Sequence, residues 1–318
     1  MMPVPRMKER DEAIDFLKCV FIILMVAFHL AWFADRHLVL KSFVYTFHMP
    51  GFLLLSGWLA SLRGKRAGAF LRRMGWTFVP YAVMESAYVV AASFLPVREE
   101  AGELTPLSLL LRLVWNPMGP YWYLHTWMLC QCICYMTLRL LPRVSVAGRV
   151  AVASCAVYGL SLVCPVFGLA NGLYFLAGWA LRESGVSLRR AFPPTAWLLL
   201  PFLLLAMSPQ VFDRATVGGV ALVCCVMSLL FRLHAVPAVG RSRVCAFIGR
   251  NTLPILLFSP VFTMAAKALL PWLSADGSGV LFMLVGTVLG VGGSLGVARA
   301  CDALRLSRWM AGGNLIKS

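Results

Sequence analysis

The chain has 318 residues, of which 60% are hydrophobic and 13% charged, and its mean hydropathy is +0.80. This composition excludes a soluble globular domain, in which about 25% of the residues carry charge. The formal net charge is +16, yet no basic stretch alternates with aromatic residues, which argues against nucleic acid as a partner. We therefore expect one integral membrane domain over residues 1–318, surrounded by the lipid bilayer, with a helical core at about 11–300 and short basic tails.

Apolar windows of about 20 residues recur along the chain and predict an all-α fold, a polytopic membrane helix bundle with about ten transmembrane helices. The pair over 146–184 also fits a short re-entrant hairpin, because Pro165 and Gly168 interrupt it. Alternating crossings put nearly all basic loop residues on the side of the two termini. The positive-inside rule then predicts that both termini are cytoplasmic and that the protein lies in the inner (plasma) membrane. The windows are 14–34, 40–62, 74–96, 120–141, 146–165, 167–184, 193–210, 214–233, 244–270 and 279–299.

The first window carries ionisable residues at membrane depth. Lys18 and His29 are eleven residues apart, which returns them to nearly the same helix face at a separation of roughly 16 Å along the axis. Asp15 lies on the same stripe. Such groups are costly in a bilayer unless they face a polar cavity, so the stripe indicates a functional site. The structural alternative is that Asp15 pairs with Lys18 near the interface and that His29 is a hydrogen-bonded packing residue.

The second window adds His48, which is followed by Pro50 and Gly51. A proline removes a backbone donor, so the carbonyls before it are expected to face a cavity at the level of His48. Ser56 and Gly57 offer a place where a helix or a ligand approaches the backbone closely. Each of these features also has a packing explanation, but a second imidazole at membrane depth favours a convergent polar site.

The third and fourth windows carry candidates with two interpretations each. Arg72 and Arg73, just before the third window, have guanidinium forks suited to phosphate oxygens, although such clusters commonly touch lipid phosphates. Glu85 is either a partner for one of these cations or a carboxylate in a cavity. Trp122 and Tyr123 are typical of an aromatic belt at the membrane interface, and their rings are also suited to line a sugar-sized pocket. No set of His and Cys has metal-ligand spacing, so no metal is expected.

The motifs in these windows resemble those of the acyltransferase 3 family of integral membrane proteins, in particular its sugar O-acetyltransferase branch, which is similar to fucose 4-O-acetylases. They occur in the family's order over residues from about 11 to 270. The first motif is a basic residue, a ten-residue spacer and a histidine, here Lys18 and His29. The others are Phe47-His48-Met49-Pro50-Gly51-Phe52 with Leu55-Ser56-Gly57, Arg72-Arg73 before Pro80-Tyr81, Trp122-Tyr123-Leu124, and Gly249-Arg250-Asn251-Thr252-Leu253-Pro254.

The resemblance implies about ten helices and transfer of an acetyl or other small acyl group from acyl-CoA to a hydroxyl of a cell-surface or lipid-linked carbohydrate. Acetyl-CoA is the expected co-substrate, and no permanently bound cofactor is implied. The chain departs from the family pattern at Trp76, where relatives often carry a second arginine, and at Ser259, near which many carry a histidine. The residues that match the motifs, and so inherit a functional role, are Lys18, His29, His48, Ser56 and Arg73.

Under this hypothesis neutral His29 acts as general base on an acceptor hydroxyl, which attacks the thioester without a covalent enzyme intermediate. His48 or Ser56 donates a hydrogen bond to the developing oxyanion. The alternative from a different class is a transporter for a polar solute or a lipid-linked sugar, with the buried His, Lys and Asp residues as a relay. Phosphate-binding candidates are Lys18, Arg72 and Arg73, and pocket candidates are Asp15, Glu85, Trp122 and Tyr123.

Overall fold

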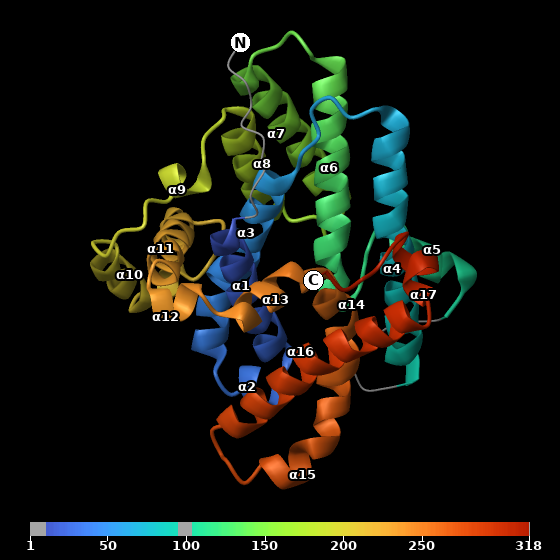
Figure 1. Cartoon of the computed structure of the whole chain (residues 1–318), viewed down its shortest axis with the longest axis vertical. Coiled ribbons are helices and arrows are strands. Elements are labelled where there is room, and N and C mark those ends of the chain that lie inside the picture. The colour runs from blue at the N-terminus through green and yellow to red at the C-terminus, as the bar shows by residue number, and fades with distance from the viewer. Residues whose placement is uncertain (1–10, 95–103, 318) are drawn as a thin grey trace.

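The structure is a computed structural model that describes residues 11–94 and 104–317, and these residues form helices and connections without a strand (Figure 1). The short basic segment predicted at residues 1–10 lies outside the described residues. The longer helices are α1 (Glu12–His29), α3 (Leu38–Leu59), α4 (Ala67–Phe94), α6 (Trp122–Leu140), α7 (Val146–Val163), α8 (Leu169–Glu183), α11 (Val217–His234), α14 (Thr252–Ala265) and α16 (Val280–Ala303). The shorter ones are α2 (Ala31–Ala34), α5 (Pro106–Val114), α9 (Leu188–Ala191), α10 (Leu199–Ala206), α12 (Pro237–Gly240), α13 (Arg243–Arg250), α15 (Leu270–Leu273) and α17 (Leu306–Ala311), with 3-10 turns η1 (Gly119–Tyr121), η2 (Pro209–Val211) and η3 (Ala266–Leu269).

Five helical segments among the described residues are long and apolar enough to cross a membrane. They agree with five of the windows expected from the sequence, and they identify a membrane protein. α1 is also long enough, but it carries Glu12, Asp15 and Lys18 within its 18 residues. The five segments are Leu38–Leu59, Val146–Val163, Val217–His234, Thr252–Leu273 and Val280–Ala303.

The window predicted at 193–210 does not form one long helix. Its helical part is α10, which has 8 residues and is therefore about 12 Å long, far less than the thickness of about 30 Å of a hydrocarbon core. Pro193 and Pro194 precede it and Pro209 follows it, and a proline restricts both its own φ and the conformation of the residue before it. The predicted pair over 146–184 forms two separate helices, α7 and α8, of 18 and 15 residues.

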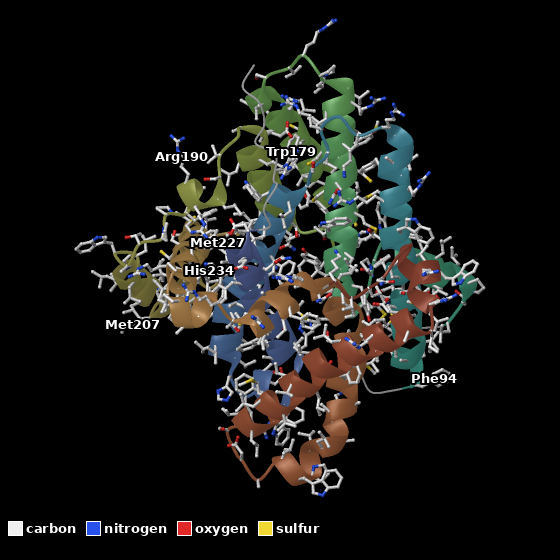
Figure 2. The ribbon with its side chains drawn as sticks, viewed as in Figure 1. Phe94, Trp179, Arg190, Met207, Met227 and His234 are labelled. Carbon is white, nitrogen blue, oxygen red and sulfur yellow. The ribbon has the colours of Figure 1, made fainter. Side chains whose placement is uncertain are left out.

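The packing of α3 against α8 is the most extensive helix–helix contact of the structure. Two glycines face each other's helix backbone there. A Cβ at Gly57 would lie 1.9 Å from the carbonyl oxygen of Phe175, and one at Gly178 would lie 1.9 Å from that of Leu54. Only glycine permits this approach. The contact expected at Ser56–Gly57 is therefore made by a helix, and the fully buried Trp179 lies beside it (Figure 2).

Basic residues gather at one end of the bundle, where the loop after α3 meets the loop after α6 (upper end in Figure 1). The ring of Tyr135 stacks on Phe70 there, with ring centroids 4.0 Å apart. Phe94 and Met207 project from opposite edges of the molecule (Figure 2) and are 79% and 80% exposed, as expected for side chains in contact with lipid. The basic residues around this end are Arg63, Lys65, Arg66, Arg139 and Arg149.

Candidate active site

His29 is the last residue of α1, and the helix backbone sets its tautomer. Its Nδ1 lies 2.6 Å from the carbonyl oxygen of Met25, one turn earlier. A carbonyl only accepts hydrogen bonds, so Nδ1 donates and, in the neutral ring, Nε2 carries the lone pair. The side chain is half-buried. His29 therefore offers a basic nitrogen on the side of the ring away from its helix.

His48 of α3 repeats this arrangement deeper in the protein. Its Nδ1 lies 2.7 Å from the carbonyl oxygen of Val44, and the residue is 1% exposed. Its Nε2 is buried and has no hydrogen-bond partner among the described residues. Because Nδ1 is already bound, a neutral His48 presents an acceptor at Nε2 and not a donor.

Both imidazoles line one cavity of about 250 Å³, which we call the histidine cavity. The guanidinium of Arg214 and the amide of Asn171 also line it, and Arg214 Nη1 donates to Asn171 Oδ1 over 3.0 Å. The walls thus combine two proton acceptors with a fixed cationic donor. Its remaining lining residues include Met25, Tyr45, Met49, Pro120, Trp122 and Leu256.

A second cavity, of about 340 Å³, is lined by cationic side chains, and we call it the cation cavity. Lys18 of α1 and Arg73 of α4 line it, together with Lys317 beyond α17. None of the described residues that line it is Asp or Glu. Its positive potential extends to the loop after α3, where the pKa of Lys65 is lowered by partial desolvation and then by the charges of Arg73 and Arg182.

One face of α6 forms a polar wall of the cation cavity through Tyr123, Trp127 and Gln131, which are one helical turn apart. Tyr123 Oη lies 2.6 Å from Ser56 Oγ. The guanidinium carbon of Arg73 lies 5.7 Å from the ring centroid of Trp127, within the range of a cation–π contact. Gln131 is fully buried, and neither atom of its amide has a hydrogen-bond partner among the described residues.

His29 also lines a third cavity, of about 520 Å³, which we call the aromatic cavity. Rings of Trp32, Tyr45, Tyr88 and Trp122 line it. Polar side chains also line it, among them Asp35, Lys267 and Ser259.

The three cavities form a row because they share lining residues. Met25 lines all three, and Met49 and Leu256 line both the cation cavity and the histidine cavity. His29 lines the histidine cavity and the aromatic cavity. A ligand with a charged end in the cation cavity therefore has to reach His29 past two flexible methionine side chains.

Asp15 lines none of these three cavities and instead positions Lys18. Its Oδ1 lies 2.8 Å from Lys18 Nζ, and its Oδ2 lies 3.8 Å from Arg250 Nε. Gly249 makes this arrangement possible, since a Cβ there would lie 1.8 Å from the carbonyl oxygen of Asp15. The expected stripe of α1 is thus divided: Lys18 faces the cation cavity and His29 the other two.

Several sequence candidates lie apart from the imidazoles. Arg72 is exposed and lines none of the three cavities, whereas Arg73 does. Glu85 is fully buried and its Oε1 accepts a hydrogen bond of 2.6 Å from the Met118 backbone, so it fastens α4 to the start of α6. Ser56 lines the cation cavity and not the histidine cavity.

Sequence reasoning missed Asn171, Arg214 and Gln131. None of the three belongs to a motif. Each lies in a different part of the chain, so the spacing of residues along the sequence could not predict that it lies at the site. An uncharged amide within an apolar window is the one signal that marks Asn171 and Gln131 in advance.

Comparison with known proteins assigns most of the chain to one family. No curated protein and no solved structure matches the chain. The family model described as Acyltransferase domain, that of the acyltransferase 3 family, matches residues 11–299. This range includes every residue of the histidine cavity. The chain therefore belongs to the acyltransferase 3 family of membrane acyltransferases.

Proposed function

We propose that the protein is a membrane-bound O-acyltransferase that moves an acetyl or other small acyl group from acyl-CoA to a hydroxyl of a cell-surface or lipid-linked carbohydrate. The observation that carries this proposal is the row of three cavities. Cationic side chains line the cation cavity, two imidazoles line the histidine cavity, and aromatic rings and polar groups line the aromatic cavity. Each cavity has the chemistry that one part of this reaction needs.

The cation cavity is suited to the donor. Phosphates of CoA bind Lys18 and Arg73, because a guanidinium fork and an ammonium group are the usual partners of phosphate oxygens. The amide of Gln131 supplies the hydrogen-bonding partner that the amides of the pantetheine arm need. The arm then passes Met25 and Met49, so that the thioester lies at the histidine cavity.

His29 is the general base, since it lines both the histidine cavity and the aromatic cavity. Its Nε2 takes the proton of the acceptor hydroxyl as the oxygen attacks the thioester carbonyl. The new C–O ester bond forms, the C–S bond breaks, and the imidazolium returns the proton to the CoA thiolate. Arg214, held by Asn171, supplies positive charge for the oxyanion, a role that suits it better than neutral His48 or the more distant Ser56.

The aromatic cavity is suited to the carbohydrate acceptor. Sugar rings present apolar C–H faces and a rim of hydroxyls, and this cavity offers Trp122 for the faces, since the guanidinium of Arg36 already lies 3.2 Å above the ring of Trp32. Asp35 and Lys267 offer hydrogen-bond partners for the rim. A lipid-linked sugar or a surface glycan would enter here and bring one hydroxyl to His29.

We further propose that the chain crosses the inner (plasma) membrane several times, with both termini in the cytoplasm. The basic end formed by the loops after α3 and α6 supports this orientation through the positive-inside rule. The cation cavity then opens toward cytoplasmic acyl-CoA, and the aromatic cavity faces the opposite side.

The test uses the purified full chain in neutral detergent and cells with and without the protein. We expect release of free thiol from acetyl-CoA by the purified protein, and an added acyl mass on a surface glycan only in cells that contain it, measured by mass spectrometry. Transport of a sugar into liposomes without thiol release would reject the enzyme and favour the transporter.

A further inference from the structure

The segment 312–317 is fixed to the bundle although it follows the family-matched residues 11–299. It leaves α17 at Gly312, whose φ of +68° lies in the left-handed region that favours glycine. A Cβ at Gly312 would lie 2.6 Å from the ring of Trp76 on α4. Trp76 is thus a packing partner of this segment.

Three successive backbone N–H groups hold the end of this segment. Those of Leu315 and Ile316 donate to the two carboxylate oxygens of Asp302 over 2.8 and 2.9 Å. The N–H of Lys317 donates to Asn251 Oδ1 over 2.7 Å, and Asn251 Nδ2 donates back to the carbonyl oxygen of Lys317 over 3.1 Å. Asn251 is fully buried, and the side chain of Leu315 is buried as well. The backbone of Lys317 is therefore set by side chains of α16 and of the junction between α13 and α14.

Through this placement Lys317 is one of the residues that line the cation cavity. Lys18 and Arg73 are the other two cations of that wall. They come from α1 and α4, so three separate parts of the chain bring a cationic side chain to one cavity, that of Lys18 as part of its ion pair with Asp15 at 2.8 Å. A cavity of this kind suits a ligand that carries more than one phosphate.

We infer that Lys317 is a further phosphate-binding residue for the donor, delivered to the cation cavity by the segment 312–317. This inference rests on the proposed function, because it takes the phosphate-rich nucleotide end of acyl-CoA as the ligand. A phosphate in a lipid headgroup has the same chemistry, so the test separates these two sources. The segment 312–317 contributes this residue from outside the part of the chain that the family model matches.

The test measures binding of adenosine 3′,5′-bisphosphate, the nucleotide end of CoA without its thioester, to the purified full chain in neutral detergent by titration calorimetry at low ionic strength. We expect Lys317→Gln to raise the Kd about tenfold, as for loss of one charge-assisted hydrogen bond, and Lys317→Arg to change it less than about twofold. Arg308→Gln is the matched control, since it removes one exposed positive charge from neighbouring α17 outside the cavity. Adenosine without phosphates should bind all four proteins alike.

Equal Kd values for Lys317→Gln and Arg308→Gln would overturn the role of Lys317, while thiol release from acetyl-CoA by the unchanged chain would leave the proposed function standing. A chain that neither binds the bisphosphate nor releases thiol would overturn both. A second titration uses micelles that contain phosphatidylglycerol or phosphatidylcholine. If Lys317→Gln weakens only the binding of phosphatidylglycerol, the residue holds a lipid headgroup and the assignment to the donor is wrong.

Discussion

The helices that carry the imidazoles and the helix that carries Arg73 are built into the bundle in different ways. α1 and α3 run through the middle of the molecule (Figure 1), and glycines bring other helices against their backbones at Asp15 and Gly57. α4 stands at the edge and buries few of its 28 residues. The two imidazoles thus lie on helices whose backbones pack directly against other helices, whereas a phosphate-binding group lies on a helix with few buried residues. Mutations in the two regions should therefore fail in different ways.

The largest effect is expected at His29. Replacement by Gln keeps a polar side chain but removes the base, so we expect the rate of acyl transfer to fall by about 10²- to 10⁴-fold with an unchanged Tm. The comparison is His37→Gln, which removes an imidazole that lines none of the three cavities. Thiol release from acetyl-CoA measures the rate. Near-normal turnover of the His29 variant would move the base role to His48, the other imidazole of the histidine cavity.

The second largest effect is expected at the contact between the backbones of α3, which carries His48, and α8. In Gly178→Ala the new Cβ would meet the carbonyl oxygen of Leu54, and separating two packed helices costs about 2–3 kcal/mol. We expect a lower Tm in detergent and a loss of activity that follows from it. Gly159→Ala on α7 is the control, because its Cβ meets nothing within 4 Å. Equal Tm values for the two variants would show that the contact between α3 and α8 yields easily.

The third effect concerns the edge helix. Arg73→Gln should raise the KM for acetyl-CoA about tenfold while kcat and Tm stay nearly constant, because the lost hydrogen bond belongs to donor binding and not to the chemical step. Arg72→Gln removes the same charge one residue earlier from an exposed position that lines none of the three cavities. Its KM should stay within about twofold of the original. Equal effects of the two substitutions would mean that the cluster acts only as a diffuse positive field.

The sequence predicts those parts of the fold that depend on local pattern. Length and hydropathy suffice for the apolar helices such as α3 and α16, and the motif spacing places Lys18 and His29 on one helix. The same rules overextend the helix at 193–210, since hydropathy averages over Pro193, Pro194 and Pro209, each of which limits the backbone.

The candidate site is only partly predictable for a different reason. Periodicity gives the face of a helix on which a side chain lies, but not the helix that this face meets. Arg214 reaches the imidazoles through Asn171, and Lys317 reaches the cation cavity through Asn251. These pairs are 43 and 66 residues apart along the chain, so only the tertiary fold brings them together.

The smallest effect is expected at Gln131. Its replacement by an apolar residue should stabilise the free protein and weaken the binding of the donor. Without donor, its buried amide has no hydrogen-bond partner among the described residues, which costs about 1–3 kcal/mol relative to an apolar side chain of similar size. We expect Gln131→Leu to raise the Tm of the free protein and to raise the KM for acetyl-CoA about fivefold. Thermal unfolding with and without CoA, together with thiol-release kinetics, measures both quantities.

Gln210→Leu provides the control, since Gln210 is the exposed glutamine of the chain and its replacement alters no cavity. If Gln131→Leu instead lowers the Tm, the amide is a structural group and has no part in donor binding. A raised Tm with an unchanged KM would mean that the pantetheine arm takes another route to His29. Only a higher Tm of the free protein together with a higher KM for acetyl-CoA fits an amide that has no hydrogen-bond partner in the free protein and gains one when the donor binds.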